Sequence, residues 1–325
     1  MKSSFFKNLG PISYSSIKEH INCTPVNIDE NKYFNDFTSI KNLNEDGLSF
    51  LTDTFFTKEN IQSNGTIICN QSTYGKFKAS NPLIIVNDVH SAVAKLSNIF
   101  YRSLSFNEIE RLDKPKIGSN CNISQSAIIE NGSIIGENVK IMAGCYVGYN
   151  CIIGDNATID CNTVITNSVI AENTYVGRNS SLGQQGFGFA INKNKNIKIF
   201  HSGRVILQAG VNIGSNCTLD RGSFGDTIIG QNTYFDNLCH VAHNVIVGNN
   251  CIFAAMTGIA GSTNIGNDVM TGGQVGIAGH LNIGNNVKIA AQSGVLKDLD
   301  NGSSVMGHPA IDKIRYIRKY KKNYA

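Results

Sequence analysis

Two histidines fall in six-residue units that otherwise hold aliphatic, small and turn-forming residues. His243 lies in the unit that begins at Val241, and His280 lies in the unit that begins at Ile277, 36 residues later. Gly261 has the third place in the unit half-way between, the place that His243 has in its own. An imidazole can act as a general base, and an exposed N–H on backbone without a Cβ can bind a developing oxyanion. These residues point to acyl transfer, provided that the fold brings them together.

The other five histidines give no comparable indication. His240 falls in a turn between two units, His201 and His308 lie in segments outside the regular period, and His20 and His90 precede the repeat. We assign no role to these five. For His243 and His280, ordinary exposure on a polar face is the alternative to catalysis.

A period of six residues organises the chain from residue 117 onward and would position the histidines. Each unit supplies one short strand and a turn, and three units close a triangular coil of 18 residues. Residues 18 apart then stack at the strand spacing of ~4.8 Å, which brings His243, Gly261 and His280 to one face within roughly 10 Å. This pattern predicts a parallel β-helix. The apolar position recurs at Ile117, Ile123, Ile129, Ile135, Ile141, Val147, Ile153, Ile159 and Ile165, slips by one residue at Ile170, and runs from Ile229 to Val295 with only Thr271 as an exception.

Cysteines occupy the narrower inward position of the same units. The six that fall there are Cys121, Cys145, Cys151, Cys217, Cys239 and Cys251. They are expected to be small fillers of the core, and the sequence has no CxxC spacing that would indicate metal or redox chemistry. Nine scattered cysteines in a chain this long favour a reducing compartment, so we expect a cytoplasmic protein.

Composition excludes several classes of protein. Of 325 residues, 41% are hydrophobic and only 16% are charged, with 32 Gly and no Trp. This balance is typical neither of a disordered chain nor of a coiled coil. A net charge of +4 without a basic stripe does not suggest nucleic acid, and no apolar run approaches the ~18 residues of a membrane span. Residues 1–8 lack the apolar stretch of a signal peptide.

Three regions are predicted along the chain. Residues 1–105 form a small α/β domain, with strands at 47–51, 66–69 and 83–86 and a helix over 89–101. Residues 106–307 form the β-helix, and residues 308–325 form a basic helical tail. Two interruptions of the period, 184–204 and 220–228, must leave the β-helix as outward loops, where function concentrates. The apolar face of the predicted helix holds Val89, Ala92, Val93, Leu96 and Phe100.

Several motifs together resemble the UDP-3-O-acylglucosamine N-acyltransferases of lipid A biosynthesis. They are Ala242-His243-Asn244-Val245, Gly186-Phe187-Gly188-Phe189, Asp220-Arg221-Gly222, and Asn81-Pro82 before an apolar strand. The resemblance implies a left-handed β-helix, and a homotrimer with active sites between subunits. It also implies transfer of a 3-hydroxyacyl chain from acyl carrier protein to the 2-amino group of UDP-3-O-acylglucosamine.

The resemblance assigns roles to particular residues. It places the general base on His243, a supporting histidine on His280 and the oxyanion-hole N–H on Gly261, with direct attack and no acyl-enzyme. The donor is the phosphopantetheine thioester of the carrier protein, and no metal or other cofactor is implied. The basic tail would dock the acidic carrier protein, or else pack the end of the trimer. Substrate binding is expected from Phe50, Asp53, Phe56, Phe187, Phe189, Asn244 and Asp236.

Two positions depart from the family pattern and keep the substrate open. Asp53 stands where the uridine-binding stretch usually has Asn, and Gln185 stands where the family usually has Asp. Phe50 and Phe56 could sandwich a uracil, or could be core aromatics of a small domain.

Other functions remain open as well. One is another nucleotide-amino-sugar N-acyltransferase, for which acetyl-coenzyme A is a candidate donor. A second is a zinc lyase of the carbonic anhydrase type, which would require three neutral histidines and has only the alternating pair His240 and His243 available. A third is a non-catalytic binding protein on the same scaffold.

Overall fold

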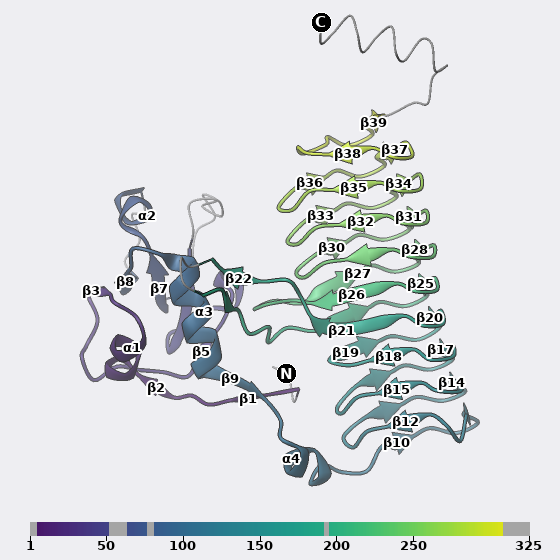
Figure 1. Ribbon diagram of the computed structural model, residues 1–325, viewed down its shortest axis with the longest axis horizontal. Coiled ribbons are helices and arrows are strands. Elements are labelled where there is room, and N and C mark those ends of the chain that lie inside the picture. Colours follow the sequence, from purple (N-terminus) through teal and green to yellow (C-terminus); the bar gives the residue numbers. More distant parts are fainter. Residues whose placement is uncertain (1–4, 52–63, 77–80, 192–194, 308–325) are drawn as a thin grey trace, which may run out of the picture.

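The computed structural model describes residues 5–51, 64–76, 81–191 and 195–307. Figure 1 shows an N-terminal domain beside a tall stack of short strands. The predicted helical tail, 308–325, lies outside the described residues. In the described part of the chain, no helix combines the length and apolarity needed to cross a bilayer.

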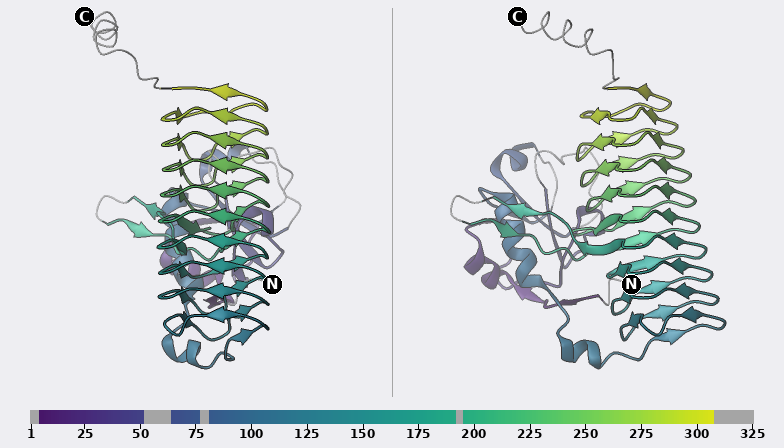
Figure 2. Two further views of the ribbon diagram at one scale, coloured as in Figure 1. Left: turned by 90° about the vertical axis from the view of Figure 1, so that its right-hand side faces the viewer. Right: turned by 45° about the vertical axis from the view of Figure 1, so that its right-hand side comes forward.

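The stack is a parallel β-helix with three sheets, one on each side of a prism (Figures 1 and 2). The first sheet holds β10 (Lys116–Ile117), β13 (Ile134–Ile135), β16 (Ile152–Ile153), β19 (Ser168–Ile170), β24 (Val205–Leu207), β27 (Thr227–Ile229), β30 (Ile246–Val247), β33 (Asn264–Ile265) and β36 (Asn282–Ile283). The second holds β11 (Asn122–Ile123), β14 (Lys140–Ile141), β17 (Thr158–Ile159), β20 (Tyr175–Val176), β25 (Asn212–Ile213), β28 (Tyr234–Phe235), β31 (Ile252–Phe253), β34 (Met270–Thr271), β37 (Lys288–Ile289) and β39 (Ser304–Val305). The third holds β12 (Ile128–Ile129), β15 (Tyr146–Val147), β18 (Val164–Ile165), β21 (Ser181–Gln185), β26 (Thr218–Arg221), β29 (His240–Val241), β32 (Gly258–Ile259), β35 (Gly276–Ile277) and β38 (Gly294–Val295).

The six-residue period fixes both register and core. Ile135 pairs with Ile153, 18 residues on, and Ile153 pairs with Ile170, which confirms the predicted slip of one residue. All three side chains are buried. Along each strand the side chains alternate between inside and outside, so one aliphatic residue per strand builds an inner ladder. The predicted β-helix is confirmed, while its left-handedness stays a prediction.

Turns between strands require a left-handed backbone conformation, which explains the abundance of Asn. Asn138, Asn156 and Asn250, for example, have φ of 54°, 58° and 58°. Asn tolerates this region better than most residues, because its short side chain can form local hydrogen bonds. At the inward position, Cys145, Cys151, Cys217, Cys239 and Cys251 are buried and Cys121 is partly buried, as predicted. All nine cysteines are free thiols.

The N-terminal domain has a five-stranded sheet covered by helices. The sheet order is β3 (Thr24–Val26), β8 (Leu83–Ile85), β7 (Thr66–Cys69), β6 (Gly47–Phe50) and β5 (Asp36–Phe37). Strands β6, β7 and β8 confirm the three predicted strands. The other elements are β1 (Phe6–Asn8), β2 (Ile12–Ser13), α1 (Tyr14–His20), β4 (Tyr33–Phe34), η1 (Ile40–Asn42), α2 (Gln71–Lys76), α3 (Val89–Phe100), β9 (Tyr101–Ser103) and α4 (Phe106–Glu110).

Helix α3 is the predicted helix, one residue shorter. Asp88 caps it by accepting a 3.0 Å hydrogen bond from the Ser91 N–H. The five predicted apolar residues are all buried. Tyr101 begins β9, which pairs with β1, so the helix ends at Phe100. Helix α4 lies within residues 106–116, before the first strand of the β-helix.

The two interruptions of the period join the β-helix to the N-terminal domain. The first, 184–204, contains a hairpin of β22 (Phe189–Ala190) and β23 (Ile197–Lys198) that lies against α3 (Figure 2). The Asn98 side chain donates to the Lys198 carbonyl at 2.8 Å. From the second interruption, the Phe224 ring packs 4.8 Å from Phe37 in the core of the domain. We name these segments, 184–204 and 220–228, the first and second arms.

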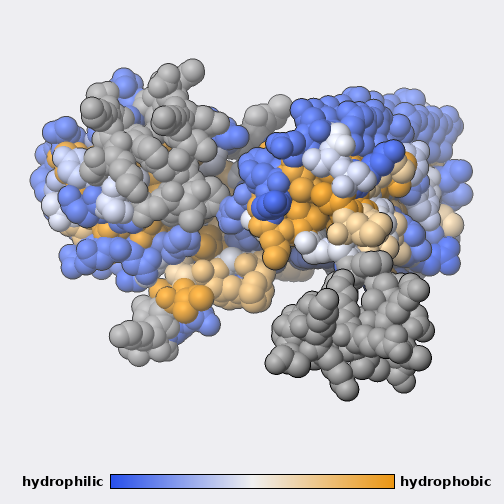
Figure 3. All heavy atoms as spheres, turned by 90° about the horizontal axis from the view of Figure 1, so that it is seen from above, coloured by the Kyte–Doolittle hydropathy of each residue, from blue (hydrophilic) through white to orange (hydrophobic). Residues whose placement is uncertain are grey.

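The C-terminal end of the β-helix is apolar. Viewed from above, hydrophobic residues gather there inside a hydrophilic edge (Figure 3). Leu296 and Met306 are exposed, and a hollow of about 510 Å³ is lined by residues of β34, β37 and β39, including Met270, Ile289 and Val305.

Candidate active site

Three of the predicted residues lie in successive turns at one corner of the prism. Val241, Ile259 and Ile277 stand in register on β29, β32 and β35. The turns that follow these strands carry His243, Gly261 and His280. The backbone ties them together, because Ser262 N–H donates to the His243 carbonyl at 2.9 Å and His280 N–H donates to the Gly261 carbonyl at 3.0 Å. The alignment that the period predicts is confirmed. We name this edge of the prism the histidine corner.

The residue after His243 fixes its imidazole. His243 Nδ1 lies 3.1 Å from Asn244 Oδ1. That oxygen also accepts from the backbone N–H of Ser223 at 3.0 Å, while the Asn244 amide donates to the Gly225 carbonyl at 3.3 Å. The orientation of the amide follows from these two partners, so the oxygen faces His243. Because an amide oxygen only accepts, Nδ1 must carry the proton, and Nε2 has a free lone pair.

Gly261 leaves space beside that lone pair. A Cβ at this position would lie 2.8 Å from His243 Cε1 and 2.9 Å from Nε2. Within the described residues, no backbone carbonyl or side chain accepts a hydrogen bond from the Gly261 N–H. The His243 imidazole thus packs directly against the Gly261 backbone.

His280 lies above, in a strained turn position. Its φ is 62°, in the region that Asn occupies in many other turns of the β-helix. Desolvation lowers the pKa of the His280 imidazole, and nearby His243 and His90 lower it less. His90 belongs to α3, so the N-terminal domain also reaches this corner.

The first arm brings a further histidine to the corner. His201 is fully buried, and its ring meets the His243 ring edge to face with centroids 5.1 Å apart. The Gly186 N–H donates to His201 Nδ1 at 3.2 Å. No role is predicted for His201 from the sequence, because it falls outside the six-residue period. Its position in the same interruption as Gly186-Phe187-Gly188-Phe189 was the only available indication.

Arg221 holds both arms in place. It belongs to the Asp220-Arg221-Gly222 motif of the resemblance, but no role of its own is predicted for it from the sequence. Its Nε donates to the His201 carbonyl at 2.9 Å and its Nη1 to the Gly183 carbonyl at 3.1 Å. The guanidinium also lies 4.9 Å from the centre of the Phe6 ring. Burial lowers the pKa of Arg221 to about 10, so it is still a cation at neutral pH. Arg221 therefore ties the arms, the β-helix and the N-terminal strand together.

The other predicted residues are more scattered. Phe187 is exposed and contacts Phe189 at 4.9 Å on the first arm. Phe50, at the end of β6, packs 5.3 Å from Phe224 of the second arm. Asp236 is exposed in the turn after β28, at a different corner from His243. Asp53 and Phe56 lie outside the described residues.

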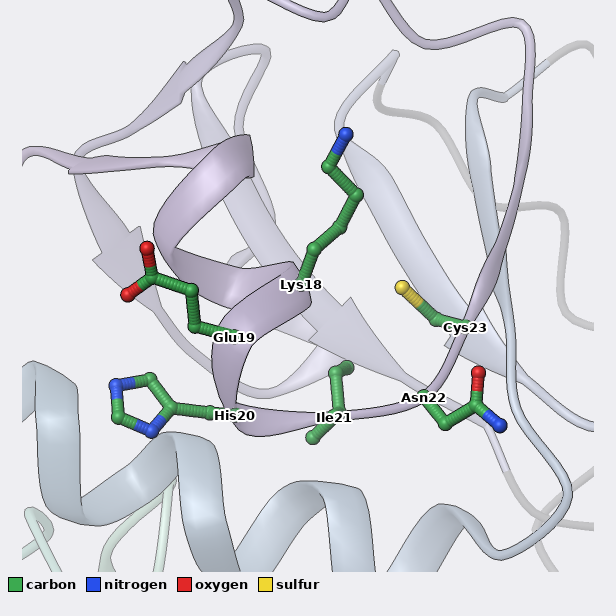
Figure 4. A pocket seen from close by; sticks show the side chains of 6 residues that line it. All are labelled: Lys18, Glu19, His20, Ile21, Asn22 and Cys23. Carbon is green, nitrogen blue, oxygen red and sulfur yellow. The ribbon is translucent and has the colours of Figure 1, made fainter.

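Other surface features lie apart from this corner. Figure 4 shows a hollow of about 430 Å³ at the end of α1, lined by residues 18–23, none of which is a predicted site residue. Within the described ranges, no group of three His, Cys, Asp or Glu side chains is arranged to hold a metal ion. His240 is exposed on β29 and its Nδ1 lies 2.7 Å from Thr218 Oγ1, whereas His243 Nδ1 faces Asn244.

Comparisons with known proteins agree on the repeat. Residues 132–167 and 226–261 match the family described as bacterial transferase hexapeptide (six repeats). A segment of 63 residues is 49% identical to a UDP-3-O-acylglucosamine N-acyltransferase of Maricaulis maris, covering 19% of this chain and 18% of that protein. A segment of 64 residues is 53% identical to the protein of the same description from Methylobacterium nodulans, covering 20% of this chain and 18% of that protein. The match thus spans about a fifth of the length of these relatives.

Solved structures with hexapeptide repeats share the fold. The Arabidopsis UDP-N-acetylglucosamine acyltransferase superposes with a TM-score of 0.55 at 21% identity, covering 64% of this chain and 73% of that one. The Bacteroides fragilis UDP-N-acetylglucosamine acyltransferase gives 0.51 at 25% identity, covering 62% and 78%. These likenesses establish a mainly β fold built on a parallel β-helix.

Proposed function

We propose that the chain is an N-acyltransferase that acylates the 2-amino group of a UDP-linked, 3-O-acylated glucosamine in lipid A biosynthesis. The observation that carries the proposal is the pairing of His243 Nδ1 with Asn244 Oδ1, which leaves Nε2 as a base beside Gly261. The relatives that match the chain are described as UDP-3-O-acylglucosamine N-acyltransferases, which supports this acceptor.

The reaction needs one base and one oxyanion donor. His243 Nε2 removes a proton from the amine as the nitrogen attacks the thioester carbonyl. The Gly261 N–H stabilises the negative oxygen of the tetrahedral intermediate. The intermediate collapses as the C–S bond breaks, and the protonated His243 returns its proton to the leaving sulfur. No acyl-enzyme forms. His280, two turns above His243, supports the base or the bound substrate.

The donor in this proposal is a 3-hydroxyacyl chain on the phosphopantetheine of acyl carrier protein. The chemistry requires no resident metal or other cofactor, because the thioester is already an activated acyl group. Docking of the acidic carrier protein on the basic tail follows from charge complementarity alone.

The N-terminal domain is proposed to hold the uridine. Phe50 and Phe56 would stack on the base and Asp53 would accept hydrogen bonds from it, while Asn244 and Asp236 would contact the rest of the nucleotide sugar. Phe187 and Phe189, close to where the first arm leaves the β-helix, would line the entrance. Phe50 already packs on Phe224 from the second arm, so a bound uracil would adjoin the joint between the domain and the β-helix.

We also propose a homotrimer in the cytoplasm. The outer face of the first sheet carries an apolar stripe that spans six successive strands and is at least partly exposed in the single chain. A second and third copy would cover it, since an exposed apolar surface of this kind marks an interface. Nine free thiols suit a reducing compartment. The stripe consists of Ile134, Ile152, Val169, Ile206, Ile228 and Ile246.

The test is a turnover assay with the purified full chain. Acceptors would be UDP-3-O-acylglucosamine and UDP-glucosamine, and donors would be carrier-bound 3-hydroxyacyl chains of several lengths and acetyl-coenzyme A. We expect transfer only from the carrier protein to the acylated acceptor. Turnover with acetyl-coenzyme A and none with the carrier would assign a different nucleotide-amino-sugar acyltransferase. Activity that survives in His243→Ala, with His240→Gln as the matched control on the same coil, would contradict the assigned base.

A further inference from the structure

His201 is a fully buried imidazole that the chemistry proposed above does not use. It lies near the end of the first arm, between the loop at Gly186 and the ring of His243. Arg221 Nε donates a hydrogen bond to the His201 carbonyl at 2.9 Å. A buried polar ring at such a place needs an account of each of its nitrogens.

The two ring nitrogens of His201 have different surroundings. Nδ1 lies 3.2 Å from the Gly186 nitrogen and 3.4 Å from the Arg221 carbonyl. The backbone N–H can only donate, so it requires an unprotonated Nδ1, whereas the carbonyl would require a protonated one. The shorter contact to Gly186 favours the unprotonated Nδ1. The ring proton then resides on Nε2, which is buried and meets no hydrogen-bond partner among the described residues.

Glycines on both sides make room for this ring. A Cβ on Gly186 would lie 2.9 Å from His201 Cε1 and 2.9 Å from His243 Cβ. A Cβ on Gly188 would lie 2.7 Å from His201 Nε2. The Gly-Phe-Gly spacing is therefore explained by packing: the loop backbone closes directly on His201, and Gly186 packs against both histidines.

The charges around His201 keep it neutral. Burial lowers its pKa to about 3, the neighbouring His243, Arg221 and Lys198 act in the same direction, and the contact with the Arg221 carbonyl opposes them. No acidic side chain is among the groups that shift its pKa. At the pH where His243 must exchange a proton, His201 carries no charge and does not compete for that proton.

We propose that His201 is a positioning residue, whose Nδ1 anchors the Gly186 N–H and whose ring face and edge hold the His243 imidazole in its catalytic orientation. The assignment rests on the proposed function, because it gives His201 its effect through the base His243. The ring holds the loop on one side and the base on the other, so both adopt one geometry before substrate binds.

Two substitutions separate the contacts of His201. In His201→Asn, Oδ1 can take the place of Nδ1 and accept from Gly186. In His201→Phe, the ring volume against His243 remains, but the acceptor is lost. We expect kcat of His201→Phe to fall about 10-fold to 100-fold with KM changed less than about 3-fold, because a misplaced group near the reacting atoms loses rate. His201→Asn keeps the anchor of Gly186 but loses the ring contact to His243, so its kcat should fall by less than that of His201→Phe.

The pH profile distinguishes positioning from proton transfer. In His201→Phe the acidic limb of kcat/KM should keep its midpoint, since the neutral His201 contributes no charge and His243 remains the titrating group. A limb that vanished would make His201 itself the base and overturn the proposal. So would a His201→Asn variant that folds, by circular dichroism, and is as impaired as His201→Phe.

A neutron crystal structure at neutral pH tests the anchor without any assay. Deuterium on His201 Nε2 and none on Nδ1 is expected, and deuterium on Nδ1 would overturn the proposal. The two proposals fail separately. Wild-type protein that is inactive with every donor and acceptor would refute the proposed function, whereas active wild type with an equally active His201→Phe variant would refute the positioning role.

Discussion

Two corners of the same prism share a backbone and differ in what their side chains bind. At the corner after the first sheet, asparagine side chains bond from coil to coil. Asn267 Oδ1 accepts from Asn249 N–H at 2.8 Å, and the Asn285 and Asn301 oxygens repeat the contact at 2.7 Å. At the histidine corner, the side chains of His243 and Asn244 turn instead toward the arms. We name the first the asparagine corner.

The difference shows how a repeat acquires a site. At the asparagine corner the side-chain amide oxygens accept from the backbone of the neighbouring coil and so serve to hold the coils together. At the histidine corner the coils are joined by backbone bonds, as from Ser262 N–H to the His243 carbonyl, and by threonine hydroxyls, as from Thr263 Oγ1 to the Ala278 carbonyl at 2.9 Å. The side chains are then available, and the second arm orients Asn244 through Ser223. The coils supply a rigid backbone and carry the proposed catalytic residues. The two arms, which are insertions in the repeat, orient the side chains of those residues.

The largest expected effect is the loss of the base. His243→Ala should lower kcat about 10³-fold, in the range that general-base catalysis contributes. The free energy of unfolding should change little, because His243 is only partly buried and its carbonyl bond to Ser262 is retained. Steady-state assays and chemical denaturation of the same preparation measure both. A large drop in the free energy of unfolding of His243→Ala, alongside the loss of activity, would mean that the two corners do not differ as described.

The period of six was sufficient to predict the coils and the alignment of His243, Gly261 and His280. Inward ladders and the 18-residue register follow from strand geometry alone, and the period even located the slip at Ile170. The helical spacing of its apolar face also predicts helix α3. The prediction is wrong only for the last residue, Tyr101, which joins a sheet.

The residues around the base could not be predicted in the same way. His201 and Arg221 meet through the paths of the two arms, which no period governs, and the partner of His243 Nδ1 depends on how the Ser223 loop turns Asn244. Their positions are set by packing between segments far apart in sequence. The predicted uridine residues Asp53 and Phe56 lie outside the described residues and stay predictions.

A methyl group at Gly261 should cost less than loss of the base. Gly261→Ala would place a Cβ 2.8 Å from His243 Cε1, so the imidazole must rotate away from the reacting position. We expect kcat to fall about 10²-fold, as for a displacement of about 1 Å. Gly273→Ala is the matched control, because Gly273 has the same place in its six-residue unit at another corner and its Cβ would meet only the Ala255 carbonyl at 3.4 Å. Similar losses in both variants would point to backbone damage rather than to His243.

Acidification should weaken the histidine corner selectively. The pKa of His201 is about 3 in the folded chain and about 6.5 when unfolded, so the unfolded state binds its proton more readily. Its contribution to stability is complete above pH 6.5 and is lost as pH falls, by about 1.4 kcal/mol per unit. Denaturant midpoints at pH 7.5, 6 and 5 should decline less steeply in His201→Asn than in wild type. Parallel declines would contradict the buried, neutral state of His201.

The asparagine corner should respond in stability alone, and by the smallest amount. Asn267→Ala leaves the Asn249 N–H without its acceptor, which costs about 1 kcal/mol for one hydrogen bond at the surface. Asn267→Asp keeps an accepting oxygen and should recover most of that loss, which chemical denaturation can resolve. Because no titratable group takes part, the deficit of Asn267→Ala should be the same at pH 7.5 and pH 6, and kcat should equal that of wild type. A drop in kcat would show that the asparagine corner also affects catalysis. The two corners would then not divide into one that only stabilises the fold and one that only acts on substrate.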